Sequence, residues 1–329
     1  ADTEVGGLSG ITYDRRRNVY YALSDDRSQR APSRFYTLKI DLGDGRLDAG
    51  DVVVVDVTPL TDRSGDSFAA KAIDPEGITL VGRRRLFIST EGDADAEPPI
   101  DPFVNRFKRS GRQKKALRLP ARFLPDADGT TGVRFNEGFE SLTSTPGGDS
   151  LYAATEASLA QDGPATDVGQ SSLARLLHYD LRDRRVRAEY VYVVEPVAEP
   201  PDPPDAFRIN GLVELLALDD EGTFLALERS FSVGRGNTVN LYEVSTAGAT
   251  DVSGEETLFP GGEMLAHEPV SKRRLLSFAD LGLVPDNLEG LAFGPPMADG
   301  RLPLIVVSDN NFNPDQETQF VLLAVELTD

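Results

Sequence analysis

The chain has 329 residues, of which 40% are hydrophobic, and its 54 acidic and 34 basic residues give a formal net charge of −20. This charge argues against nucleic acid as a partner, because binding to phosphate backbones needs clustered positive charge. The chain contains no cysteine, which excludes disulfides, thiol catalysis and cysteine-ligated metals. No apolar run approaches the roughly 20 residues of a membrane-spanning helix, so we expect no membrane insertion.

The composition is compatible with a site for hard metal cations. A surplus of carboxylates suits either solubility or the binding of hard cations such as Ca²⁺. With only two histidines, a His-rich metal site is not expected. The sequence starts at Ala1 without Met and shows no signal peptide, so we interpret it as a processed or trimmed form.

One hairpin pattern recurs five times along the chain. An acidic or polar residue is followed by a small residue, alternating apolar residues, a turn, a second apolar strand and a final acid. The copies start at Ser9, Glu76, Glu140, Glu214 and Glu289. Their spacing of roughly 65–75 residues is long enough for a repeat of four strands with loops.

Further strand-like runs, rich in Val, Leu, Tyr and Phe, follow the hairpins. After the first two hairpins they lie at 34–42, 52–57, 104–108 and 116–119. After the last three they lie at 174–181, 186–195, 238–245, 274–279 and 320–327. Helical periodicity is nearly absent, although a short helix is expected at 279–284.

Serial four-stranded units at this spacing predict an all-β protein, a β-propeller of five blades forming a single domain over residues 1–329. A propeller of six blades is the alternative, because the insertion at 251–274 is long enough for a degenerate blade. The last blade lacks an outer strand, which the residues before Gly6 would supply. The proline-dense stretch at 196–204 is interpreted as a stiff loop between blades.

The two ends of each hairpin point to a site. In a propeller blade, the first strand starts and the second strand ends on the same face, so the acids at these positions should gather at one mouth of the channel. The expected carboxylates are Asp25, Glu76, Glu91, Glu140, Glu156, Glu214, Glu228, Glu289 and Asp309. Like charges this close disfavour one another unless a cation binds, and carboxylates are the ligands that Ca²⁺ prefers. The alternative is that these acids cap strand ends, paired with arginines or solvated.

Glu76, Glu137 and Glu140 are the candidate catalytic residues. Glu137 is of interest because it has no counterpart in most copies of the hairpin. Arg27 and Arg229 directly follow second-strand acids, so they either balance that charge or bind the oxygens of an anionic substrate. Arg134, just before the third hairpin, is a further candidate for substrate binding.

Other arginines are expected to have no such role. They lie at 15–17 and 83–85, in the turns between first and second strands, and so belong to the opposite face of the blades. We interpret them as solvated turn residues.

Motifs at these same positions resemble those of the bacterial phytase-like family, named for the "esterase-like activity of phytase". They are GGLSGITYD (6–14), ALSDDR (22–27), DPEGI (74–78), FNEGFESLT (135–143), NGLVELLAL (210–218), LALERSF (225–231), NLEGLAFGP (287–295) and VVSDNNF (306–312). They span nearly the whole chain in order. The resemblance implies an exported bacterial protein, periplasmic or extracellular, and hydrolysis of phosphomonoesters or esters.

Together, residues and resemblance favour a Ca²⁺-dependent hydrolase of phosphate esters, acting as a monomer on a small anionic substrate such as phytate. A Ca²⁺-dependent lactonase or carboxylesterase at the same mouth is a second hypothesis. A third is a non-catalytic propeller that binds a ligand or a protein and holds a structural Ca²⁺.

Overall fold

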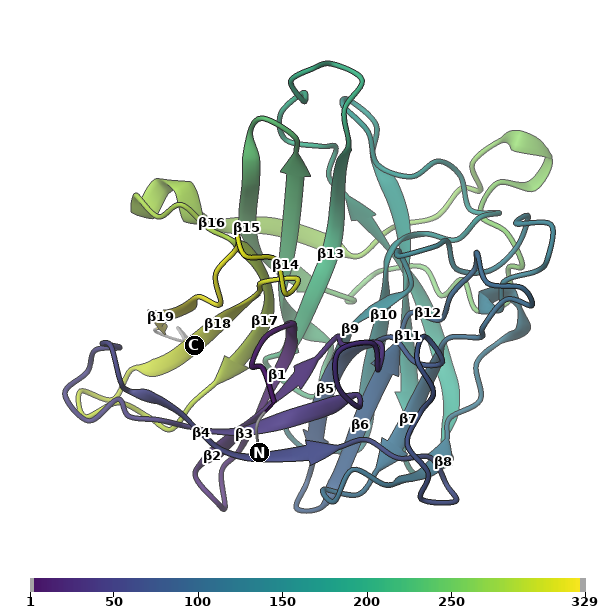
Figure 1. Cartoon of the computed structure of the whole chain (residues 1–329). Coiled ribbons are helices and arrows are strands. Elements are labelled where there is room, and N and C mark those ends of the chain that lie inside the picture. Colours follow the sequence, from purple (N-terminus) through teal and green to yellow (C-terminus); the bar gives the residue numbers. More distant parts are fainter. Residues whose placement is uncertain (1–2, 326–329) are drawn as a thin grey trace. The chain divides into compact units, whose positions relative to one another are not determined.

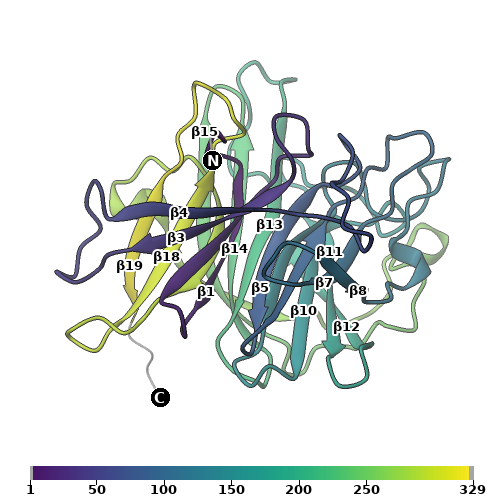
Figure 2. The same ribbon diagram turned by 60° about the horizontal axis from the view of Figure 1, so that its bottom comes forward.

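The computed structural model describes residues 3–325 and is nearly all β. Its 19 strands form five sheets, four of four strands and one of three, and in every sheet the strands are adjacent in chain order (Figures 1 and 2). The fold is a five-bladed β-propeller, as the five hairpin repeats predicted. None of its helices is of the length and apolar character that crossing a membrane requires, within the residues described.

The sheets follow the repeats. The first contains β1 (Leu8–Asp14), β2 (Val19–Ser24), β3 (Arg34–Ile40) and β4 (Val52–Pro59). The second contains β5 (Pro75–Val81), β6 (Arg85–Thr90), β7 (Phe103–Phe107) and β8 (Gln113–Ala116). The third contains β9 (Phe139–Ser144), β10 (Ser150–Ser158), β11 (Ser172–Asp180) and β12 (Arg185–Val194).

The last two sheets include the long insertion and the C-terminal strand. The fourth contains β13 (Arg208–Ala217), β14 (Thr223–Ser232), β15 (Gly236–Ser245) and β16 (Ser271–Ser277). The fifth contains β17 (Asn287–Phe293), β18 (Leu302–Asp309) and β19 (Phe320–Val325). The 3-10 helices are η1 (Ala121–Phe123), η2 (Pro260–Gly262) and η3 (Phe278–Leu281), the last overlapping the helical segment expected at 279–284.

Burial explains why the hairpin strands have the strongest sequence signal. β2 is buried along its whole length, whereas the outermost strand β4 exposes Val53, Val54 and Val55 at its free edge. An inner strand is covered on both faces and therefore reads as a nearly continuous apolar run. An outer strand needs fewer apolar residues, so its limits are harder to predict.

The chain forms two compact units. The first consists of Ala1–Ile88, Arg106–Lys115 and Asp286–Asp329, and the second of Ser89–Asn105 and Ala116–Pro285. The first unit holds the first and fifth sheets, and the second unit holds the third and fourth. The boundary runs through the second sheet.

Each unit has its own hydrophobic core. In the first unit Ile11, Tyr20 and Ile305 belong to one buried cluster. In the second unit Tyr192 and Phe224 belong to another. Stacked inner faces of neighbouring sheets therefore provide the stability of each unit.

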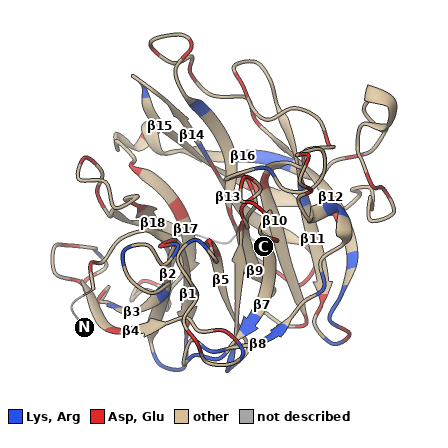
Figure 3. Ribbon diagram, turned by 45° about the vertical axis from the view of Figure 1, so that its right-hand side comes forward, with Lys and Arg blue, Asp and Glu red and all other residues tan. Residues whose placement is uncertain are grey.

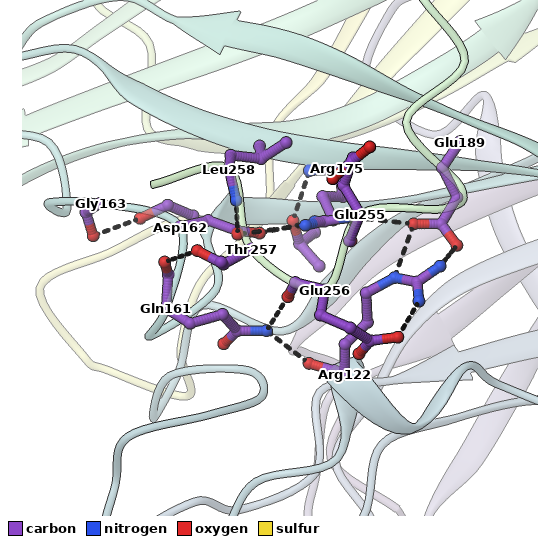
Figure 4. Close-up of polar contacts among 12 residues, drawn as sticks. Arg122, Gln161, Asp162, Gly163, Arg175, Glu189, Glu255, Glu256, Thr257 and Leu258 are labelled. Atoms are coloured by element: carbon purple, nitrogen blue, oxygen red, sulfur yellow. Dashed lines mark hydrogen bonds and ion pairs between the residues drawn. The ribbon is translucent and has the colours of Figure 1, made fainter. Parts of the chain in front are cut away.

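The insertion between β15 and β16 adds no further blade, which removes the six-blade alternative. It is held by a buried ionic network in the second unit (Figure 4). Arg175 bonds to Asp162 at 2.5 Å and to Glu189 at 3.1 Å, and Arg122 bonds to Glu189 at 2.6 Å. The insertion joins this network through the N–H of Leu258, which donates to Asp162 at 2.7 Å.

The fifth sheet has three strands in the described part of the chain. The expectation that the residues before Gly6 complete it is wrong for residues 3–5, which form no strand. Instead the carbonyl of Glu4 accepts a bond from the Tyr36 hydroxyl at 2.6 Å, which ties this segment to β3.

Candidate functional site

A β-bulge marks the start of the first strand in four sheets. The strand pairing skips one residue there, and the skipped residues are Ser9, Glu140, Val213 and Glu289. A bulge leaves one residue outside the regular alternation and redirects its side chain. The acids that start the hairpins are therefore bulge residues in the third and fifth sheets, and Ser9 is the bulge residue in the first.

The fourth sheet differs from the predicted alignment by one residue. Leu212 pairs with Glu228, as Phe139 pairs with Thr155 in the third sheet. Arg229, and not Glu228, therefore occupies the position that Glu156 has in the third sheet. Likewise Glu214 follows the bulge and does not form it, so its predicted equivalence with Glu140 is wrong.

This one-residue difference sends Glu228 to the other face of its sheet, because strand side chains alternate. There it is buried and accepts bonds from Tyr192 Oη at 2.7 Å, Lys272 Nζ at 2.7 Å and Asn210 Nδ2 at 3.1 Å. Glu214 Oε1 accepts the backbone N–H of Leu142 at 3.3 Å. Both carboxylates have structural partners at these positions.

Three other carboxylates of the second unit come together. Oxygens of Glu91, Glu140 and Glu156 lie within 4.8 Å of one another. All three side chains are buried. The predicted proximity of Glu140 and Glu156 is thus confirmed, and Glu91 joins them from the preceding hairpin. We call this set the carboxylate cluster.

Two glycines make room for the cluster. The N–H of Gly138 donates to Glu91 Oε1 at 2.8 Å, and a Cβ on Gly138 would lie 2.5 Å from the backbone of Glu91. A Cβ on Gly211 would lie 2.1 Å from Glu156 Oε1. Only glycine allows these approaches, so both positions help to fix where the carboxylates lie.

Arg229 supplies a positive charge beside the cluster. It pairs with Gly211 across the β13–β14 hairpin, and its Nη2 lies 3.8 Å from Glu156 Oε1. The side chain of Arg229 is 12% exposed and that of Glu156 is 1% exposed, so their attraction is only weakly screened by water. A guanidinium thus lies beside the three carboxylates of the cluster.

Glu137 and Arg134 lie at the start of the same hairpin. Burial raises the pKa of the Glu137 carboxyl, and the positive charge of Arg134, whose Nε is 3.9 Å away, opposes this rise. Glu137 Oε2 is buried and accepts no hydrogen bond from the described residues. Arg134 itself bonds to the carbonyls of Ser158 at 3.1 Å and Gly163 at 2.6 Å, which places it as a clamp on the loop after β10.

The first unit contains its own acidic groups. Burial, and then the charges of Glu289 and Asp74, raise the pKa of Asp25 to about 7. Arg27 pairs with Asp74 at 3.2 Å. Asp74 was not among the predicted site residues, although it directly precedes Pro75-Glu76 in one of the motifs. The spacing along the chain gave no sign that it lies beside Arg27.

The remaining candidates of the first unit are held by local bonds. Glu289 Oε1 accepts the side-chain N–H of Asn287 at 2.9 Å, and Asp309 Oδ1 accepts the N–H of Asn311 at 2.7 Å. Glu76 is buried, and its backbone carbonyl accepts the Ser9 hydroxyl at 3.0 Å. Glu289 and Asp309 therefore take part in hydrogen bonds of the local fold, as Glu214 and Glu228 do in the second unit.

The carboxylate cluster fits a hard divalent cation. Its donor atoms are carboxylate oxygens, which Ca²⁺ prefers, and buried carboxylates at this spacing disfavour one another's ionised form. A Ca²⁺ bound between the three carboxylates would lower the repulsion among them.

Comparisons with known proteins find one curated relative, several similar structures and one family. A curated relative, an uncharacterized secreted protein of Arthroderma benhamiae, is 26% identical over 211 residues, which are 54% of this chain and 39% of that protein. This chain therefore matches well under half the length of that relative.

Several solved structures are similar over nearly the whole chain. The periplasmic gluconolactonase PpgL of Pseudomonas aeruginosa is 12% identical with a TM-score of 0.35, covering 99% of this chain and 75% of that one. A bifunctional GH43-CE protein of Bacteroides eggerthii is 12% identical with a TM-score of 0.47, covering 98% and 33%. The Dos1 propeller is 8% identical with a TM-score of 0.38, covering 98% and 69%.

One family covers almost the entire sequence. The family model described as "Phytase-like: Esterase-like activity of phytase" matches residues 3–312, which include all five hairpins and every residue of the carboxylate cluster. The motifs that suggested this resemblance lie at the bulges and at the ends of the second strands, where the structure places its acidic groups. The chain belongs to the phytase-like family.

Proposed function

We propose that the chain is a Ca²⁺-dependent hydrolase of phosphate esters whose reacting centre is the carboxylate cluster of Glu91, Glu140 and Glu156. The observation that carries this proposal is the burial of three carboxylates within 4.8 Å of one another. Such an arrangement is costly unless it holds a cation, and the family description connects this fold with phytase and esterase-like activity.

The proposed roles follow from position. Glu91, Glu140 and Glu156 would hold Ca²⁺, which when bound supplies charge neutralisation for the substrate and a more acidic water. The ionised carboxylate of Glu137 would accept the proton of the attacking water through Oε2. Burial raises the pKa of this carboxyl, which makes the carboxylate a stronger base. Gly138 connects the proposed base to the proposed metal ligands, because its N–H donates to Glu91 and the preceding residue is Glu137.

Arg229 would orient an anionic oxygen of the substrate. Its guanidinium is partly exposed, and a cation beside Glu156 would weaken the attraction between Arg229 and that carboxylate. The freed donors would then point toward a phosphate oxygen. Arg134 is not assigned this role, because its donors are already bonded to loop carbonyls.

A second candidate, a Ca²⁺-dependent lactonase or carboxylesterase, is favoured by the charge of the site. Three buried carboxylates gather in the cluster, and a highly anionic substrate such as phytate would be repelled by them unless several cations bind with it. A neutral lactone or ester avoids that repulsion. The same Ca²⁺, Glu137 and Arg229 would serve this reaction.

We also propose that the protein is exported. The support is the secreted relative of Arthroderma benhamiae. Periplasmic and extracellular locations would both suit the proposed chemistry, because Ca²⁺ is abundant outside the cytosol.

One set of assays separates the candidates. Phosphate release from phytate and from simple phosphomonoesters is measured beside hydrolysis of lactones and aryl esters, each with Ca²⁺ and with chelator. Glu140→Gln should lower the rate on the true substrate at least about 100-fold, because it removes one charged ligand at the reacting centre. Glu221→Gln, an exposed acid in the turn after β13, is the matched control and should keep the rate.

The outcomes are distinct. Activity that survives Glu140→Gln, or persists unchanged in chelator, contradicts the proposed centre. Activity on lactones or aryl esters without phosphate release selects the second candidate. No turnover of any substrate, with Ca²⁺ raising only the melting temperature, selects a binding propeller with a structural Ca²⁺.

A further inference from the structure

The first unit contains a pocket of opposite charge. It has a volume of about 440 Å³ and is lined by Arg16, Arg17, Arg83, Arg84 and Arg109. These residues come from the β1–β2 turn, the β5–β6 turn and the segment between β7 and β8. The sequence predicted solvated turn arginines at 15–17 and 83–85, but the fold brings the turns of two blades and Arg109 around one cavity. We call it the arginine pocket.

A buried carboxylate holds part of this pocket in place. Asp14 Oδ2 accepts bonds from Arg17 Nη1 at 3.1 Å, Arg109 Nη1 at 3.2 Å and Tyr21 Oη at 3.1 Å. Its other oxygen accepts the backbone N–H of Arg16 at 3.1 Å. Since Asp14 is 2% exposed, it acts as a fixed anchor that orients two guanidiniums and one turn.

The positive charge of the pocket exceeds what Asp14 balances. Arg16, Arg83 and Arg84 form no ion pair with any residue in the described part of the chain. Gathered guanidiniums repel one another, so this arrangement is favourable only when an anion or a shell of counterions occupies the pocket. In a chain of net charge −20, such a concentration of arginine is not explained by composition.

The pocket is separate from the acidic groups of the same sheet. Asp14 pairs with Val19 at one end of the β1–β2 hairpin, and Leu8 pairs with Ser24 at the other end, next to Asp25. Seven residues of extended chain span about 20 Å. An anion in the arginine pocket would therefore not be repelled strongly by Asp25.

Neighbouring residues reinforce the positive potential. The segment 106–115 of the first unit carries Lys108, Arg112 and Lys114, and Figure 3 shows blue segments at β7 and β8. The charge of Lys108, with smaller effects from burial and from Arg112, lowers the pKa of Lys114. Positive charge is thus dense enough here to affect proton binding.

We propose that the arginine pocket is a binding site for a small polyphosphate, distinct from the carboxylate cluster. Guanidinium groups bind phosphate through paired N–H donors, and several of them match a ligand with oxygens in several directions. The volume lies within the roughly 300–1,000 Å³ typical of ligand sites, which is more than one inorganic phosphate needs. The lining by arginine excludes an apolar ligand.

Pyrophosphate is the test probe, and its dissociation constant is measured by calorimetry with the whole chain in EDTA, so that no metal occupies the acidic groups. The double variant Arg16→Gln/Arg84→Gln should weaken binding by about 100-fold, because each lost charge-assisted contact contributes about tenfold. The matched control Arg46→Gln/Arg63→Gln removes the same charge from exposed positions outside the pocket and should change the constant less than about threefold. Inorganic phosphate, which has fewer oxygens to engage several guanidiniums at once, should bind at least about tenfold more weakly.

Three results would overturn the proposal: no binding of pyrophosphate by the native chain, an equal loss in the control variant, or inorganic phosphate binding as tightly as pyrophosphate. The melting temperatures of both double variants should not fall below that of the native chain, since only exposed side chains change.

Discussion

Arg229 and Glu156 face each other at 3.8 Å, each at the same position of its hairpin in neighbouring blades of the second unit. Where the third sheet has a carboxylate, the fourth has a guanidinium. The pair therefore sets the charge of the carboxylate cluster, which would otherwise consist of acids alone.

The first prediction concerns this pair. Arg229→Gln should increase the affinity of the cluster for Ca²⁺ by about tenfold or more, because the variant removes the positive charge that competes with the cation. In EDTA the same variant should lose about 1–3 kcal/mol of unfolding free energy, since Glu156 stays buried beside two other acids. Calorimetry with Ca²⁺ and urea denaturation measure the two effects.

Arg235→Gln is the matched control, because Arg235 is exposed in the turn after β14. It should change neither quantity. An Arg229→Gln protein that binds Ca²⁺ as weakly as the native chain, or more weakly, would show that Arg229 does not oppose cation binding.

The second prediction tests the close approach at Gly211. Gly211→Ala places a methyl group where Glu156 Oε1 lies, so the carboxylate must move. Ca²⁺ affinity should fall by about tenfold or more, while the unfolding free energy in EDTA falls by about 1–2 kcal/mol. Calcium titration followed by thermal melting separates the two effects.

Gly254→Ala gives the comparison, because a Cβ there meets no atom within 4 Å. It should leave Ca²⁺ affinity unchanged. If Gly211→Ala lowered stability but kept native Ca²⁺ affinity, Glu156 would not belong to the metal centre.

The third prediction concerns pH and the first unit. Burial and the nearby acids raise the pKa of Asp25 from 3.8 to about 7 in the folded protein. The folded state then binds a proton that the unfolded state has released, so the unfolding free energy should fall as pH rises from about 4 through about 7. Asp25→Asn should remove that part of the decline, a few kcal/mol at most, because one pKa unit corresponds to about 1.4 kcal/mol.

Urea denaturation in EDTA at several pH values measures this effect. Asp44→Asn, in an exposed turn, should keep the native pH profile. Parallel profiles for the native and Asp25→Asn proteins would mean that Asp25 is ionised throughout this range.

The fourth prediction concerns the ionic network of the second unit. Arg175→Met leaves Asp162 and Glu189 buried without their shared cation, and should cost about 3–5 kcal/mol of unfolding free energy. Arg182→Met, which removes an exposed arginine paired with Asp149, should cost less than about 1 kcal/mol. Equal losses in the two variants would contradict the structural role assigned to the network.

The β-propeller was predictable because its signal is local. Each blade begins with a hairpin whose strands are buried on both faces, and such strands read as short apolar runs between turn residues. Five such hairpins at nearly constant spacing require a repeated sheet architecture. The acids at the hairpin ends were visible for the same reason, and the proximity of Glu140 to Glu156 followed from a single turn.

Register and long-range contacts were decided only in the folded chain. The sequences Val213-Glu214 and Glu228-Arg229 allow two alignments that differ by one residue. Because side chains alternate along a strand, each acid faces one side of the sheet in one alignment and the other side in the second. The buried partners of Glu228, namely Tyr192, Asn210 and Lys272, select one of them. The arginine pocket likewise depends on the bond from Arg109 to Asp14, two residues 95 positions apart, which no local pattern records because it depends on how neighbouring blades pack.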